Sequence, residues 1–373
     1  MTRMAGIVRR LRGMSSGRVL PALIAFAFPA LLAAQAPIDS DGFAELPKFD
    51  AGVWIAGFPD STALAVLARK LSALNCKWLI LPAGDSLSAG DWTKGAAAMA
   101  AAVRGRIFWV APAVAPDYRS GWRPDQGLAG ASESFSRGAT ALYFSRAVGM
   151  ELQNADGSFV LPDDTLLTVF FERAEAGRKP VVIEAGERRN SWLPEESMDL
   201  EGDQVYFTHH LREHAYLRPG VPDYWRQIEA RDLVVDRFAG VRFIASHLGS
   251  LEWSVSELAG RLERYPNLAV DLAGRLPHLQ KQDREEVRRF LIEHQDQVIY
   301  ASGIELDLSR DDPNDLLAEV MECYLEDYRW LATDELIETD YIGAGATVEG
   351  LALPPEVVAK IFFNNAVRWY QGQ

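Results

Sequence analysis

Histidine and cysteine are scarce in this chain. Its 373 residues include two cysteines, Cys76 and Cys323, at a spacing that fits neither a zinc knuckle nor a redox pair, so we expect buried thiols. No Gly-x-Ser-x-Gly motif occurs, which argues against a serine nucleophile on a strand-to-helix turn. None of the six histidines lies in the first half of the chain, and they are His209, His210, His214, His247, His278 and His294.

Positive charge is also in deficit. The chain has 38 Lys and Arg against 52 Asp and Glu, a net charge of −14. Nucleic acids and anionic membranes are bound by clustered Lys and Arg, so we expect neither as a partner. A small-molecule ligand or substrate is the expected partner, and a homo-oligomer stays open.

Charge is absent from one long run, Val19 to Ala34, which follows five arginines between Arg3 and Arg18. This layout is typical of a signal peptide, with an uncleaved membrane anchor as the second interpretation. We expect residues 1–36 to be a signal peptide and residues 37–373 to form one domain. The mature chain would begin between Gln35 and Pro37, and the protein would be exported to the periplasm or the extracellular space.

The remainder alternates short apolar runs with longer amphipathic segments, a rhythm that predicts βα units and a parallel sheet. The predicted strands are Val53–Gly57, Lys77–Pro82, Ile107–Pro112, Ala141–Arg146, Pro180–Gly186, Val241–His247, Leu268–Gly274 and Val298–Gly303. Eight such strands, each with room for a helix after it, predict a (β/α)8 TIM-like barrel.

The segments between the strands refine this prediction. Ser61 is a candidate cap for the first helix, and Gly177 for the end of another. The long segment Glu187–Pro222, after the fifth strand, is expected to be a lid loop. Asp312–Thr333 and Pro354–Gln371 are expected to be two closing helices.

The stretch "RFIASHLGSLEW" places His247 at the carboxyl end of the sixth predicted strand, before a turn and a helix starting near Trp253. Parallel α/β folds bind their ligands at this end of the strands. His247 is therefore the first candidate for a functional residue.

The sequence around His247 resembles a known family. The segment Tyr224–Arg275, with "VIYASGIEL" and "KIFFNNAVRWY" nearer the carboxyl end, resembles the amidohydrolase-related branch of the amidohydrolase superfamily, which includes decarboxylases. The likeness runs from about Lys48 to the end. It implies a distorted (β/α)8 barrel and a divalent metal held by His-x-His after strand one, a His after strand five and an Asp after strand eight.

This chain departs from that ligand pattern. Gly52 and Trp54 stand at the His-x-His positions, Glu184 at the strand-five His and Gly303 at the strand-eight Asp. Tyr143 stands where some members have a metal-bridging lysine. Catalytic metals usually have at least three protein ligands, so we expect no metal or other cofactor. A zinc-like ion held by Glu184 and His247 is the alternative, and restoring Gly52, Trp54 and Gly303 to metal ligands would be expected to recreate the site.

Two functions remain open. The first is a catalytically degenerate, ligand-binding barrel, with a pocket built from aromatic and basic side chains: Trp54, Tyr143, Arg146, Arg188 and Trp192. The second is an active hydrolase or carboxy-lyase, with Glu184 as base and His247 as acid, with or without a metal. His210 and His214 also have the spacing of a zinc pair on one helix face, although we expect them to belong to a polar lid segment instead.

Overall fold

The computed structural model describes residues 40–84, 87–115, 118 and 121–372. The proposed signal peptide and its cleavage site lie outside the described residues. Within the described part, no helix has both the length and the apolar content needed to cross a bilayer.

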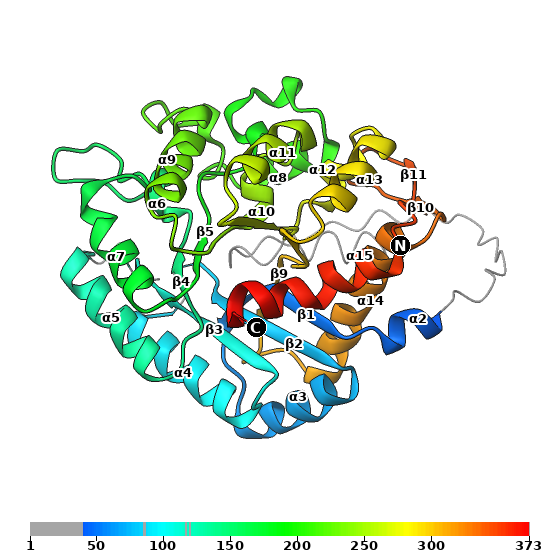
Figure 1. Cartoon of the computed structure of the whole chain (residues 1–373), viewed down its shortest axis with the longest axis horizontal. Helices are drawn as coiled ribbons and strands as arrows, with labels where there is room; N and C mark the ends of the chain where they lie inside the picture. Colours follow the sequence, from blue (N-terminus) through cyan, green and yellow to red (C-terminus); the bar gives the residue numbers. More distant parts are fainter. Residues whose placement is uncertain (1–39, 85–86, 116–117, 119–120, 373) are drawn as a thin grey trace, which may run out of the picture.

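The centre of the molecule is a nine-stranded sheet in the order β8-β7-β6-β5-β4-β3-β2-β1-β9 (Figure 1). All of its neighbouring strands are parallel. The strands are β1 (Lys48–Gly57), β2 (Cys76–Pro82), β3 (Ile107–Pro112), β4 (Ala141–Phe144), β5 (Val181–Ile183), β6 (Phe243–Ala245), β7 (Leu268–Asp271), β8 (Val298–Ile299) and β9 (Ile304–Asp307). A separate antiparallel pair comprises β10 (Leu336–Glu338) and β11 (Thr347–Glu349).

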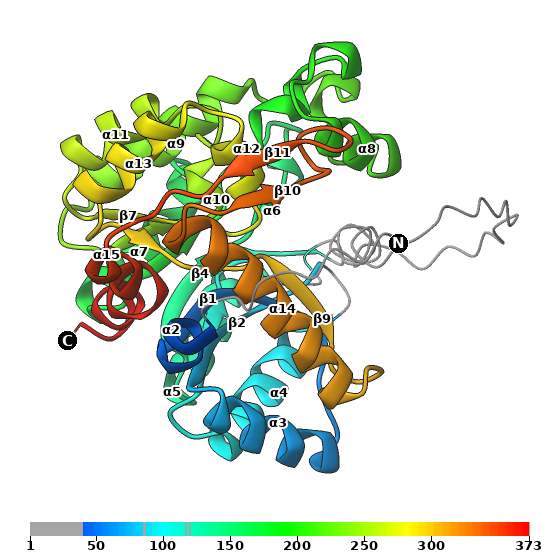
Figure 2. The ribbon, with the colours of Figure 1, turned by 90° about the vertical axis from the view of Figure 1, so that its right-hand side faces the viewer.

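Helices lie around the outside of this sheet (Figures 1 and 2). The longer ones are α3 (Ser61–Ala73), α4 (Ala89–Ala102), α5 (Pro124–Ser136), α7 (Thr168–Ala176), α8 (Glu201–His209), α9 (Tyr224–Arg237), α11 (Val255–Arg264), α13 (Arg284–Glu293) and α14 (Pro313–Ala332). Shorter ones are α2 (Ser40–Glu45), α6 (Ala147–Met150), α10 (Ser246–Gly249), α12 (Leu276–Gln280) and α15 (Pro355–Ala359), followed by the π-helical segments η6 (Lys360–Asn364) and η7 (Val367–Gln371).

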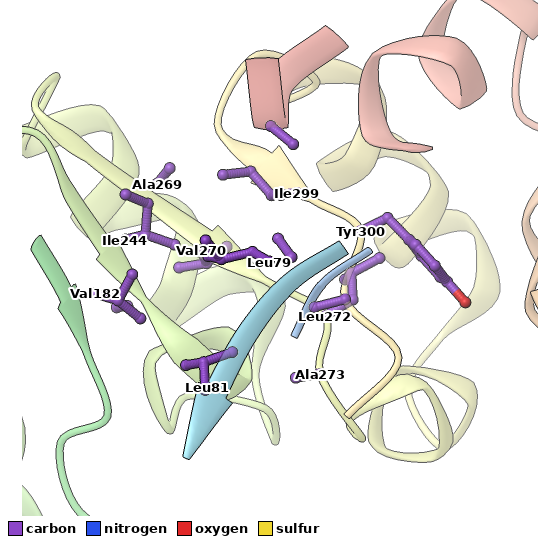
Figure 3. Close-up of a cluster of buried hydrophobic side chains, with 14 of the residues drawn as sticks. Leu79, Leu81, Val182, Ile244, Ala269, Val270, Leu272, Ala273, Ile299 and Tyr300 are labelled. Carbon is purple, nitrogen blue, oxygen red and sulfur yellow. The ribbon is translucent and has the colours of Figure 1, made fainter. Parts of the chain in front are cut away.

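The core fills the inside of the sheet because the strands are apolar along nearly their whole length. Figure 3 shows buried side chains of Leu79 and Leu81 from β2 close to those of Val182, Ile244 and Val270 from β5, β6 and β7. Strands that are far apart in the sheet order thus share one core. The sheet is therefore strongly curled.

The two ends of the curl meet through the segment after β8. The amide of Ala51 donates to the carbonyl of Tyr300 (3.0 Å), and the amide of Gly303 donates to the carbonyl of Gly52 (3.1 Å). The buried carboxylate of Asp50 accepts hydrogen bonds from the Ser302 amide (2.9 Å), the Ser302 hydroxyl (2.5 Å), the Tyr324 hydroxyl (2.6 Å) and the Gly52 amide (3.0 Å). Burial raises the pKa of Asp50 to about 6.

Several details differ from the sequence prediction. The eighth predicted strand is shorter, and the unpredicted strand β9 pairs with β1 instead. The cap of α3 is Asp60, whose carboxylate accepts from the amides of Thr62 and Ala63, so Ser61 is the first helical residue. The segment Glu187–Pro222 is not a plain loop, because it contains α8 and three short 3-10 helices.

Candidate functional site

The turn that carries His247 has an unusual backbone. His247, Leu248, Gly249 and Ser250 all have φ between 56° and 61°, in the left-handed region. Each non-glycine residue in this region costs about 1 kcal/mol or more. Such strain persists only where the surroundings enforce it, and it is concentrated at functional sites.

Buried polar groups hold this turn in place. Asp271 accepts from the His247 amide (2.8 Å) and from the Ser246 hydroxyl (2.8 Å). The Ser250 hydroxyl donates to the Ala185 carbonyl (2.8 Å), and the guanidinium of Arg231 donates to the Gly249 carbonyl. The direction of the His247 side chain is thereby fixed.

Both ring nitrogens of His247 face hydrogen-bond acceptors. Nδ1 lies 2.7 Å from the Ala273 carbonyl, and Nε2 lies 3.3 Å from Oε1 of Glu184. A nitrogen beside a carbonyl must carry a proton, so Nδ1 is a donor. One proton then lies between Nε2 of His247 and Oε1 of Glu184. The pair is either an imidazolium with a carboxylate or a neutral imidazole with a carboxylic acid.

Glu184 is held by a third group. The Tyr143 hydroxyl donates to Oε2 of Glu184 at 2.5 Å, so both carboxylate oxygens have partners. Burial acts to raise the pKa of Glu184, but the hydrogen bond and charge of His247, the charge of Arg146 and the Tyr143 hydroxyl together lower it. These interactions favour the ionised form of the Glu184 carboxyl group.

Trp54 covers the face of His247. Their ring centroids are 5.3 Å apart and their planes differ by 16°. The structure therefore brings together Trp54, Tyr143, Glu184 and His247, which come from four different strand ends.

Arg146 lies at the edge of this group but is already paired. It donates to Glu187 (3.0 Å) and Glu213 (2.6 Å), and its side chain is 23% exposed. Glu187 also meets Arg188 and Arg275, each at 3.2 Å. The positive charges at this end of the sheet are thus matched by carboxylates.

Arg188 and Trp192 have structural contacts instead of free surfaces. Arg188 is buried and donates to Asp203 (2.8 Å) and the Tyr341 hydroxyl (2.9 Å). Trp192 packs on Tyr224 with 5.4 Å between ring centroids. We therefore assign both residues to support of the segment Glu187–Pro222.

Glu305 is a residue that the sequence analysis missed. It is the register partner of Trp54 on neighbouring strands, so the two side chains lie on the same face of the sheet. Its carboxyl is partly buried, and burial raises its pKa to about 7, with Arg146 opposing the rise and Glu213 and Asp307 adding to it. The strand β9 that carries it was not predicted, because "GIELD" follows the eighth predicted strand without a helix.

Residues 96–372 match the amidohydrolase family model. The chain belongs to the amidohydrolase family. No curated protein matches this family member significantly.

Three solved structures are similar to this chain. An uncharacterised TIM-barrel protein from Bordetella bronchiseptica is similar, with 14% identity, coverage of 87% of this chain and 99% of the other, and a TM-score of 0.50. A 4-oxalomesaconate hydratase from Rhodopseudomonas palustris has 12% identity, coverage of 87% and 95%, and a TM-score of 0.46. A 2,6-dihydroxybenzoate decarboxylase from Rhizobium has 12% identity, coverage of 86% and 99%, and a TM-score of 0.45. The first likeness indicates a fold of the TIM-barrel type.

The residues present do not fit the divalent metal that the amidohydrolase resemblance implies. No group of three or more His, Cys, Asp or Glu side chains is arranged to hold an ion among the residues that the structure describes. A Cβ on Gly52 would lie 2.8 Å from the Cβ of Ala301 and 3.0 Å from the Trp54 ring. A metal-binding side chain at Gly52 would therefore need its neighbours to move.

His210 and His214 do not form the zinc pair that their spacing had left open as an alternative to a polar segment. Helix α8 ends at His209, so His210 and His214 do not share a helix face. His210 Nδ1 lies 2.7 Å from the Tyr206 carbonyl, and His214 Nε2 lies 2.8 Å from the Leu193 carbonyl. The spacing would place the two histidines on one helix face only if the helix continued past His209, and it does not.

Proposed function

We propose that this member of the amidohydrolase family is an exported barrel protein that binds a small organic ligand and lacks the metal-dependent chemistry of the superfamily. The main support is the environment of His247. Its two nitrogens are engaged by Ala273 and Glu184, and Trp54 lies flat against its ring. The groups that would activate a substrate satisfy one another instead.

The proposal includes a distorted (β/α)8 barrel. In it, Tyr300 and β9 take the place of a direct pairing between β8 and β1, supported by the hydrogen bonds of Ala51 and Gly52. The segment Glu187–Pro222 would be a lid over the carboxyl ends of the strands. Helix α14 and the helical run from α15 to η7 would be the closing helices.

The proposed ligand is neutral or cationic. Trp54 offers an aromatic edge, and Glu305 a carboxyl group, at the same end of the sheet. Arg146 and Arg188 are already neutralised by carboxylates, so neither offers an unpaired charge to a ligand carboxylate. An apolar or aromatic amine would meet both the indole and the acidic group.

Elemental analysis of the native, exported protein tests the loss of metal chemistry. We expect zinc, manganese and iron far below one ion per chain, and no change in thermal stability on addition of a chelator. Stoichiometric metal that is lost in His247→Ala or Glu184→Ala would overturn the proposal and return the protein to the metal-dependent hydrolases.

One observation favours a second function, an active hydrolase or carboxy-lyase that needs no metal. Glu305 has a pKa raised to about 7, which suits a group that exchanges a proton at neutral pH. In this case Glu305 would act as acid or base, with the Glu184–His247 pair orienting the substrate. A turnover screen with esters, lactones and aromatic carboxylates tests it: activity abolished by Glu305→Gln would support it, and an inactive wild-type protein would count against it.

Export can be tested separately. Amino-terminal sequencing of protein recovered from the periplasm or medium is expected to begin between Gln35 and Pro37. A cytoplasmic protein that retains Met1 would contradict export without affecting the other proposals.

A further inference from the structure

A hollow lies at the opposite end of the sheet from His247. Its volume is about 290 Å³, and its walls include Thr140, Lys179 and Arg242. These residues lie one or two positions before β4, β5 and β6, so the hollow is at the amino ends of the strands. Tyr370 and Gln371 at the end of η7 complete it, near the carboxyl end of the chain (Figure 1).

The charge of this hollow is positive. Arg178, Lys179 and Arg242 line it, and no Asp or Glu is among its lining residues. Lys179 Nζ donates to the Ala139 carbonyl (3.1 Å), and Arg242 Nη2 lies 3.5 Å from the Arg178 carbonyl. These contacts are to neutral oxygens and leave the three charges without a carboxylate in the described part of the chain.

Four buried or partly buried arginines elsewhere in the protein have carboxylate partners. Arg146, Arg188, Arg231 and Arg275 each contact a carboxylate within 3.2 Å. A cation that is partly removed from water without an opposite charge is costly. Burial accordingly lowers the pKa of Lys179 and the pKa of Arg242.

One hydrogen-bond donor beside the hollow has no acceptor. The side-chain nitrogen Nε2 of Gln371 is buried and has no hydrogen-bond partner among residues 40–84, 87–115, 118 and 121–372. A buried N–H group without an acceptor costs about 1–3 kcal/mol, so such groups normally have a partner. The hollow thus combines three cations with a neutral donor that has no partner, and none of the described residues that line it supplies a negatively charged acceptor.

We propose that this hollow binds a phosphate group, either as inorganic phosphate or as part of a small phosphate monoester. A phosphate dianion supplies several acceptor oxygens and enough charge to face two arginines and a lysine. The volume exceeds that of a single tetrahedral anion, which leaves room for a small organic group. This site is separate from the His247 end of the sheet and does not depend on the function proposed there.

Thermal stability in phosphate tests the site with the full mature protein. At constant ionic strength and neutral pH, we expect inorganic phosphate to raise the melting temperature in a saturable way, while chloride and acetate do not. Calorimetric titration with phosphate and with a sugar phosphate then distinguishes the free anion from the monoester.

Three variants locate the effect. Arg178→Gln, at the exposed rim, is expected to weaken phosphate binding by about tenfold without affecting folding, and the double variant Lys179→Gln/Arg242→Gln to abolish it. Lys94→Gln, which removes an exposed lysine on α4, serves as the matched control and should bind as the wild-type protein does. No saturable response in the wild-type protein, or an equal response in a folded Arg178→Gln variant, overturns the proposal.

Discussion

Gly303 lies directly against the backbone of Gly274. A Cβ placed on Gly303 would be 2.6 Å from the amide nitrogen of Gly274, and Gly303 has a φ of +75°. The contact leaves no room for a side chain unless the backbone moves, and the dihedral angle adds strain. Restoring an aspartate at this position would therefore not recreate a metal ligand, contrary to the expectation from sequence.

A pair of glycine variants checks this. In Gly274→Ala the added Cβ has no atom within 4 Å, and the only cost is the backbone strain at a φ of +62°. We therefore expect a loss of about 1 kcal/mol in the free energy of unfolding. Gly303→Ala must also displace backbone, and we expect a loss of about 3 kcal/mol or more. Urea unfolding of both variants gives the comparison, and equal losses would show that the contact at Gly303 is relieved cheaply.

Asp203 is expected to be a critical residue for stability. It is fully buried and accepts from Arg188, Asn190, His278 and Tyr341. Asp203→Ala removes the closer of the two carboxylate partners of the buried Arg188 and leaves three other donors without their acceptor, so we expect a loss of about 3–5 kcal/mol. Asp199→Ala removes an exposed carboxylate that also binds Asn190, and this control should lose less than about 1 kcal/mol.

Asp50 gives a sharper test, because two substitutions should differ. Asp50→Ala leaves two amides and two hydroxyls without an acceptor, with an expected loss of about 3–5 kcal/mol. Asp50→Asn keeps one oxygen for the amides, and its NH2 group can donate to the hydroxyls, which can turn to accept. Calorimetry should find the asparagine variant milder, and equal damage from both would mean that the negative charge itself is required.

Glu305 predicts a dependence of stability on pH. Its pKa rises from 4.5, the ordinary value of a glutamate, to about 7 on folding, so the folded state binds more protons than the unfolded state between these values. Stability should therefore fall as pH rises from about 4.5 to 7. Glu305→Gln should remove that loss, and so be more stable than wild type by about 1–3 kcal/mol above neutral pH and equal to it in acid.

Melting curves across this pH range check the Glu305 prediction. Glu293→Gln, an exposed carboxyl on α13, is the control and should follow the wild-type curve throughout. A Glu305→Gln curve that stays parallel to that of the wild type would show that Glu305 titrates normally.

The sequence predicted the strands well because their side chains are buried along almost every position. Ile107–Pro112 was found with its exact bounds as β3, since a run of large apolar residues between polar segments has few other interpretations. The proximity of Glu184 and His247 followed from the same rule, because parallel strands end on one side of the sheet. The family likeness gave the same architecture independently.

Other features depend on contacts that no local pattern contains. The left-handed turn at His247 is imposed by Asp271 and Arg231, which are distant in sequence. The pairing of Arg188 with Asp203 depends on the fold of the segment after β5, which lacks a regular pattern. Glu305 lies on a strand that is recognisable only by its pairing with β1.

The position of β1 has a consequence for the order of folding. Its Asp50 receives a hydrogen bond from Tyr324, 274 residues later in the sequence, and its second neighbouring strand is β9. During synthesis, β1 therefore cannot complete its pairing until β9 and Tyr324 have left the ribosome, near the end of translation. Contacts over such distances slow folding, because a long loop must close before they form. The nascent chain should remain sensitive to proteases until α14 has been made, and a chain in that state would still be able to pass through a translocation channel.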